Sequence, residues 1–224
     1  MRYLRAICVV LMGMVFVGYT QAATDAREQV NRLSEEAALL AQSQQSAGIA
    51  LADEIWNLAE LGYLEFQSSA ALQNYLRGNG FQVEIDVGGI PTAFVASYRS
   101  NSADDADPVI AILAEFDALP GLNQAAAPFR SVSKEGGSGH ACGHHLFGAA
   151  SSTAAVAVSQ WLLANNVQAT IKLVGTPAEE GGSGKVYLAR AGVFDGVDVV
   201  LHWHPGDGNS ASPSSTTSNK SGRF

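Results

Sequence analysis

All five histidines of this 224-residue chain lie in two short clusters, and this grouping limits the folds that the chain can adopt. The clusters consist of His140, His144 and His145, followed by His202 and His204. Cys142 stands two residues before His144, so a single turn would aim a thiolate and an imidazole at one point. Thiolates, neutral imidazoles and carboxylates are the ligands that borderline divalent metals take. The grouping favours a metal site over the alternative in which Cys142 is a small buried residue and the histidines are structural.

Helical and strand patterns alternate along the sequence, which indicates an α/β fold. Helices are predicted over residues 24–46, 49–60, 66–77, 146–164 and 186–191. Strands are predicted over residues 81–87, 92–98, 108–114, 169–174 and 198–201. The first two strands form a predicted hairpin, because the turn composition Gly-Gly-Ile-Pro separates them. Residues 122–139 show neither periodicity and predict a long loop that leads into the Cys142 turn.

Acidic residues follow two of the predicted strands. Asp117 comes just after the apolar run 108–114, and Glu179 and Glu180 come after the run 169–174. Sites in open α/β sheets form beyond the carboxyl ends of the strands, so these carboxylates are candidate functional groups. Adjacent carboxylates point in different directions, so one would bind a metal while the other faces its water. Asp117 is equally compatible with capping the next turn, and the glutamate pair with a solvated acidic turn.

Three classes of function are disfavoured. The segment 175–185 resembles a phosphate-binding loop, but Glu179 replaces a required glycine and Val186 replaces the required Ser or Thr. Ser138 and Ser183 each lack one flanking glycine of a serine-hydrolase elbow. The net charge is −8, the pI is about 5.0, and no basic patch is present, so nucleic acid is not an expected partner.

The first 22 residues have the pattern of an export signal. Two arginines precede an apolar run over residues 6–17, and an Ala-Ala pair ending at Ala23 offers a cleavage site. The run is shorter than the roughly 18 to 20 residues that span a bilayer, which argues against the alternative of a stable membrane anchor. We therefore expect export to the periplasm or secretion. Cleavage would remove Cys8 and leave Cys142 as the sole thiol, which metal ligation would explain.

The ordered motifs resemble the metal-dependent amidohydrolase and peptidase family that contains aminoacylases, hippurate hydrolases, indoleacetyl-amino-acid hydrolases and carboxypeptidase G-like enzymes. The motifs that carry the resemblance are Gly88-Gly89-Ile90-Pro91-Thr92-Ala93, Glu115-Phe116-Asp117-Ala118-Leu119-Pro120-Gly121, Gly139 to Gly148, Pro177 to Gly182 and Trp203-His204-Pro205. The resemblance implies the N-terminal part of an α/β catalytic domain, with a mixed sheet and helices on both faces. It also implies hydrolysis of an amide bond in a small N-acyl amino acid, a dipeptide-like or an aminobenzoyl-glutamate-like substrate.

The same resemblance implies roles for the matched site residues. It implies two divalent metal ions, zinc or manganese, held by Cys142, His144, Glu180 and His204. Glu179 matches the family's general base, and Asp117 matches an acid that supports the metal ligands. His202 falls at a position that varies among relatives, and His140 and His145 receive no role.

Family members carry an inserted lid and dimerisation domain, and then a return to the catalytic domain that supplies one more histidine ligand. We therefore expect residues 23–207 to form the N-terminal part of the catalytic domain. Residues 208–224 are expected to begin the inserted domain or to form a disordered tail. The expected full-length form is a homodimer, and this chain would be a truncated piece with an incomplete site. The alternative is a short protein that binds metal or peptide without turnover.

Overall fold

The computed structural model describes residues 24–101 and 104–208. The predicted export signal and the predicted tail beyond residue 208 lie outside the described residues. The helices are residues 24–43, α2 (Gln45–Leu58), α3 (Phe66–Gly78), the 3-10 helix η1 (Val87–Gly89), α4 (His144–Asn165), α5 (Glu179–Gly182) and α6 (Gly184–Arg190). The strands are β1 (Gln82–Ile85), β2 (Phe94–Arg99), β3 (Val109–Ala114), β4 (Thr170–Gly175) and β5 (Val199–Leu201).

The five strands form one mixed sheet in the order β1-β2-β4-β3-β5. β1 and β2 form the predicted antiparallel hairpin, and β2 continues antiparallel to β4. β3 pairs in parallel with β4 on one side and with β5 on the other. The carboxyl ends of these three strands therefore lie at the same edge of the sheet. This confirms the predicted α/β class and the mixed sheet.

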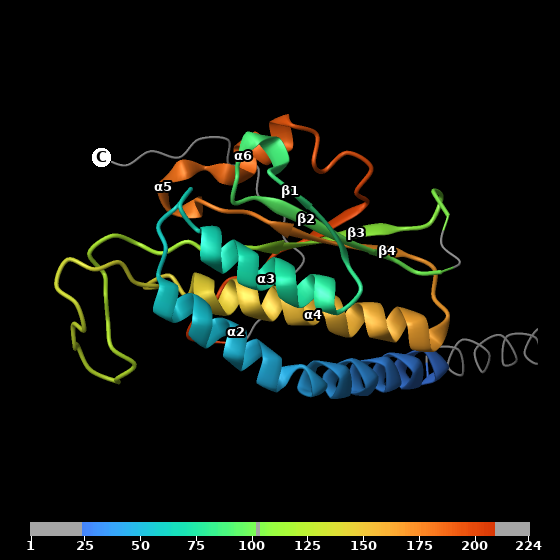
Figure 1. Ribbon diagram of the computed structural model, residues 1–224. Coiled ribbons are helices and arrows are strands. Elements are labelled where there is room, and N and C mark those ends of the chain that lie inside the picture. Colours follow the sequence, from blue (N-terminus) through green and yellow to red (C-terminus); the bar gives the residue numbers. More distant parts are fainter. Residues whose placement is uncertain (1–23, 102–103, 209–224) are drawn as a thin grey trace, which may run out of the picture.

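Helices cover both faces of the sheet. Side chains alternate along each strand, so alternate residues of a strand enter the cores on opposite faces. On β3, Ile112 and Ala114 belong to the core under α2, α3 and α4, whereas Ala111 and Leu113 belong to the core under η1 and α6. Figure 1 shows α2, α3 and α4 grouped on one side of the sheet and α6 on the other. β3 is apolar on both faces because both of its faces are covered, as the continuous run 108–114 predicted.

Several predicted boundaries change in the structure. The helix predicted from residue 146 begins at His144, and the helix predicted from residue 186 begins at Gly184. The strand predicted over residues 198–201 is β5, and His202 and His204 follow it. β5 ends at Leu201, because only three of its residues pair with β3, so both histidines lie in the segment after the strand. The predicted loop over residues 122–139 is confirmed.

α4 is long and apolar enough to cross a membrane by length and composition alone. However, 56% of its most apolar window is buried inside the protein. Its buried residues pack in the core against β3, β4, α2 and α3. These contacts account for its apolar composition as that of a core helix.

Candidate metal centre

The site lies where β3 and β4 end, and the strand register sets its geometry. Ala114 pairs with Gly175, so the segments that follow these residues leave the sheet side by side. One segment carries Glu115 and Asp117, which are both buried, and the other carries Glu179 and Glu180. The backbone N–H of Glu180 donates to Oδ2 of Asp117 at 2.8 Å, which joins the two segments directly.

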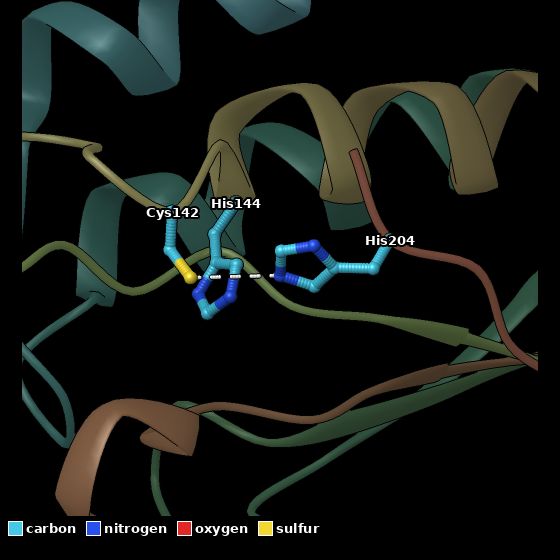
Figure 2. Close-up of side chains that lie close together, drawn as sticks. All are labelled: Cys142, His144 and His204. Atoms are coloured by element: carbon cyan, nitrogen blue, oxygen red, sulfur yellow. Dashed lines mark hydrogen bonds between the residues drawn. The ribbon is translucent and has the colours of Figure 1, made fainter. Parts of the chain in front are cut away.

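The Cys142 turn approaches this edge from the start of α4. Gly143 precedes the helix with a φ of 79°, a left-handed conformation that glycine adopts without strain. A Cβ added at Gly143 would lie 3.0 Å from the Pro205 ring, so glycine also permits the close approach of the segment that carries His204. Cys142 is the free cysteine of the described chain, and its Sγ lies 3.5 Å from Nε2 of His204 (Figure 2).

Cys142, His144 and His204 each offer one ligand atom, and these atoms all lie within 4.8 Å of one another. Figure 2 shows the three side chains pointing toward one another from the turn, the first turn of α4 and the segment after β5. Nδ1 of His204 lies 2.9 Å from the carbonyl oxygen of Pro205, which can only accept a hydrogen bond, so Nδ1 carries the hydrogen. The Nε2 lone pair of His204 therefore faces the thiol.

His144 lies between two carboxylates and is fully buried. Its Nδ1–H donates to Oδ1 of Asp117 at 2.8 Å. Its Nε2 lies 2.8 Å from Oε2 of Glu115, at ion-pair distance, and neither of these buried atoms has another partner among the described residues. Burial opposes the charged ring, but the carboxylates of Asp117 and Glu115 outweigh burial and raise the pKa of His144 to about 10.

Glu115 is a site residue that the sequence analysis did not single out. Its carboxylate forms ion pairs with Lys185 and His144 and lies 3.3 Å from Nε2 of His202. Burial alone would raise its pKa, but these contacts with His144 and Lys185 lower the pKa of Glu115 to about 2. Ligand atoms of Glu115, His144 and Glu179 form a second group within 4.8 Å. The position of Glu115 at the carboxyl end of β3, two residues before Asp117, was the sequence signal that could have identified it as a site residue.

The glutamate pair lies on α5, a short turn with irregular backbone. Oε1 of Glu180 is buried without a hydrogen-bond partner among the described residues. Burial and then the neighbouring carboxylate of Glu180 raise the pKa of the Cys142 thiol to about 12, with Glu179 and Glu115 adding to the effect. Glu180 thus lies beside Cys142, although neither group of ligand atoms within 4.8 Å in the described chain includes it.

These donors fit a divalent cation. Among the described residues Oε1 of Glu180 is buried without a hydrogen bond, which is costly, while the buried Nε2 of His144 and Oε2 of Glu115 are paired only with each other. A cation would satisfy them together. A sulfur, two imidazole nitrogens and carboxylate oxygens form a donor set typical of zinc, and the carboxylates also suit manganese.

His140 and His145 take part in a ring cluster behind the turn. The ring of Trp56 contacts His145 edge-on at a centroid distance of 4.8 Å, and the two histidine rings lie 5.1 Å apart. Nε2 of His140 bonds the Ile55 carbonyl at 3.0 Å. Burial lowers the pKa of both histidines, that of His145 to about 4. These contacts hold the Cys142 turn against α2 through histidine rings that are uncharged at neutral pH.

The residues after β5 pack around Phe147 of α4. The rings of His202 and Trp203 lie 5.0 and 5.4 Å from the Phe147 ring, and the indole N–H of Trp203 donates to Oγ of Ser151. His202 reaches Glu115 but does not belong to either ligand group. Next to the turn, a cleft of about 430 Å³ is lined by Trp56, Gly121, Leu122, Asn123, Gln124, Arg130, Val132, His140 and Ala141.

Comparisons with known proteins bear on the same residues. Residues 111–217 match the sequence profile of peptidase family M20/M25/M40. The chain is 46% identical over 156 residues to one of the subunits of the p-aminobenzoyl-glutamate hydrolase of Escherichia coli, covering 69% of this chain and 31% of that protein. It is 30% identical over 208 residues to the Xaa-Arg dipeptidase of Mus musculus, covering 89% of this chain and 44% of that protein.

A solved structure shares the fold. A dinuclear metal-binding peptidase of the M20 family from Bacillus subtilis superposes with a TM-score of 0.54 at 27% identity, covering 72% of this chain and 44% of that one. The chain spans about a third to a half of the length of the relatives that it matches. The comparisons therefore apply to the part of those proteins that contains the turn, the glutamate pair and the segment after β5.

Proposed function

Because the chain belongs to peptidase family M20/M25/M40, we propose that it is the N-terminal part of a metal-dependent hydrolase that cleaves an amide bond. One observation carries this proposal. His204 lies 62 residues after Cys142 along the chain, yet the ligand atoms of Cys142, His144 and His204 gather within 4.8 Å at the edge of the sheet that holds four carboxylates.

The proposed ligands are Cys142, His144, Glu180 and His204, and two divalent ions are the proposed cofactor. When bound, such ions polarise an amide carbonyl and acidify the attacking water. Asp117 holds the proton on Nδ1 of His144 and thereby leaves Nε2 for a metal. Both zinc and manganese agree with this donor set, since thiolate favours zinc and carboxylate oxygen suits manganese.

Glu179 is the proposed general base. Its carboxylate lies in the group with Glu115 and His144, so it faces the ligand side chains. A base at this place would take the proton of the attacking water and return it to the leaving amine. Glu115 is buried and forms an ion pair with Lys185, whereas Glu179 is the exposed carboxylate of this group.

The proposed substrates are small amides of amino acids. The relatives are named for aminobenzoyl-glutamate and for dipeptides ending in arginine, and both compounds join an acyl group to an amino-acid nitrogen. The cleft beside the turn has the volume of a small-molecule site and carries the Trp56 and His140 rings together with Arg130. The two rings suit an aromatic or apolar acyl group of the substrate, and the guanidinium of Arg130 suits its carboxylate.

Three further proposals concern the whole protein. Residues 1–22 are a proposed export signal, which would place the protein in the periplasm or outside the cell. Residues 23–207 are the proposed N-terminal part of the catalytic domain, and residues 208–224 the proposed start of an inserted domain or a tail. The proposed full-length form is a homodimer.

The test is hydrolysis by the full-length protein. Release of free amino acid from aminobenzoyl-glutamate, an N-acyl amino acid and a dipeptide is measured before chelation, after chelation, and after addition of zinc or manganese. We expect chelation to abolish release and one of the metals to restore it, and Cys142→Ser to lower the restored rate. Release that survives chelation contradicts the proposal. Stoichiometric metal binding without release from any substrate favours metal binding without turnover instead.

A further inference from the structure

Glu65 is a buried carboxylate outside the proposed ligand set. It immediately precedes α3, but its side chain makes no capping hydrogen bond to that helix. The residue is 0% exposed. Among the described residues, no lysine, arginine or histidine lies within ion-pair distance of its carboxylate. Burial of a carboxylate without a cation is costly and raises the pKa of Glu65 to about 7.

Both oxygens of Glu65 hold segments that belong to other parts of the chain. Oε1 accepts the backbone N–H of Ala178 at 2.8 Å, and Oε2 accepts the hydroxyl of Thr92 at 3.0 Å. Ala178 ends the loop after β4 and directly precedes Glu179. The carboxylate of Glu65 therefore reaches the residue next to the proposed base.

The turn that carries the base has an unusual backbone that needs external support. Ala178 has a φ of 57°, which is uncommon for a residue with a side chain. Two buried carboxylates hold this turn from both ends: Glu65 accepts the N–H of Ala178, and Asp117 accepts the N–H of Glu180. Glu179 lies between these two anchored amides.

Neighbours of Glu65 add to this support. The hydroxyl of Tyr63 donates to the carbonyl of Gly182 at 2.5 Å. A Cβ added at Gly62 would lie 3.0 Å from Cα of Ala178, so the backbone of this segment lies directly against the turn. The segment before α3 thus packs along the whole base turn, and Glu65 supplies its buried hydrogen bond to that turn.

We propose that Glu65 is a positioning residue, which fixes the Ala178 amide and thereby the direction of the Glu179 carboxylate. The inference rests on the proposed function, since it assigns Glu65 an effect on the proposed base. Glu65 acts through Ala178 and does not touch the reacting atoms. A displacement of about 1 Å in a catalytic group costs on the order of 100-fold in rate.

The test compares three variants of the full-length protein. Glu65→Ala removes the acceptor for the Ala178 N–H, whereas Glu65→Gln keeps an amide oxygen at this place. The matched control is Glu60→Ala, because Glu60 also accepts backbone N–H groups, but those of Gln67 and Ser68 in the first turn of α3. We expect Glu65→Ala to lower kcat about 100-fold with KM and metal content near wild type, and Glu65→Gln and Glu60→Ala to keep kcat within about threefold.

A second readout does not need turnover. Hydrogen exchange measures the backbone amides of residues 178–180 in the wild type and in each variant. We expect the Ala178 amide of the wild type to be protected like those of β4, and Glu65→Ala to accelerate exchange in this segment alone. Glu60→Ala is expected to accelerate exchange in α3 instead.

Defined results overturn the inference. It fails if Glu65→Ala keeps its kcat, if Glu60→Ala loses as much kcat, or if exchange rises equally throughout the protein. If Glu65→Ala does not fold, an Ala178 amide in the wild type that exchanges as fast as the loop 122–139 overturns it, and a protected amide supports it. If the wild type hydrolyses nothing, the proposed function fails, and the exchange data alone decide the role of Glu65.

Discussion

Nδ1–H of His144 donates to a carboxylate oxygen of Asp117 at 2.8 Å, and both side chains are buried. A carboxylate only accepts, so this contact fixes a proton on Nδ1 and leaves Nε2, which lies 2.8 Å from Oε2 of Glu115, as the nitrogen available to a metal. The other oxygen of Asp117 accepts the N–H of Glu180. One carboxylate thus orients an imidazole and the turn that carries the glutamate pair.

The first prediction concerns Asp117→Asn. The amide is isosteric, but its NH2 group would face either Nδ1 of His144 or the N–H of Glu180, so one of the two bonds is lost. Loss of such a supporting bond typically lowers metal affinity by about 10- to 100-fold. Competition with a chromophoric chelator measures the affinity. Asp53→Asn on α2 is the control, and equal affinities in the two variants would contradict the role of Asp117.

The second prediction concerns Glu179→Gln. Glutamine keeps the size of the side chain but cannot take a proton, and a placed base contributes roughly 100- to 10,000-fold to the rate. We expect turnover by the full-length protein to fall by that factor while bound metal, measured by elemental analysis, stays unchanged. A variant with the wild-type rate would show that another group is the base.

Sequence patterns predicted most of the fold, because the elements carry their own signals. The run 108–114 is apolar on both faces since the sheet is covered on both faces of β3, and this burial is visible in composition. The proposed ligands at Cys142 and His144 were identified because metal ligands form rare local motifs. The structure brings these two side chains together with His204, as expected for one site.

Glu65 and Glu115 were missed for a physical reason. The role of Glu65 depends on contacts with Thr92 and Ala178, which are 27 and 113 residues away along the chain. A glutamate outside any ligand motif has no local signal of burial, and only the tertiary structure shows that Glu65 points inward.

The third prediction compares two helical glycines. A Cβ at Gly148 in α4 would lie 2.8 Å from the carbonyl oxygen of Glu115, whereas a Cβ at Gly78 in α3 meets nothing within 4 Å. We expect Gly148→Ala to lower the free energy of unfolding by about 1 to 3 kcal/mol, since α4 must move away from β3. Gly78→Ala should be neutral or raise it by up to about 1 kcal/mol. Urea denaturation measures both, and equal effects would contradict the close packing.

The fourth prediction concerns the pH dependence of stability. Burial raises the pKa of Glu65 from 4.5 to about 7, so the folded chain holds this proton more tightly than the unfolded chain. The contribution of this proton to the free energy of unfolding is complete below the pKa of Glu65 in the unfolded chain. It is lost as the pH rises through the folded pKa of about 7. The loss from this group is on the order of 3 kcal/mol. Urea denaturation at about pH 5 and pH 8 should show a smaller loss in Glu65→Gln than in the wild type, and identical losses would contradict it.

The fifth prediction links metal binding to proton release. Burial and the carboxylates of Glu180, Glu179 and Glu115 raise the pKa of Cys142 to about 12, and Asp117 and Glu115 raise the pKa of His144 to about 10. Both groups therefore hold a proton at neutral pH without metal, and each must lose it to bind a metal. Apparent zinc affinity should rise with pH between about 6 and 8, by up to about 100-fold per pH unit for two protons.

Calorimetry in two buffers of different ionisation enthalpy counts the protons released for each zinc ion bound. We expect up to two in the wild type and one fewer in Cys142→Ser, since serine has no acidic proton in this range. Lys172→Gln on β4, away from the ligand groups, is the control and should release as many protons as the wild type. An affinity that stays constant across this pH range would mean that zinc binds without displacing these protons, and would remove Cys142 and His144 from the ligand set.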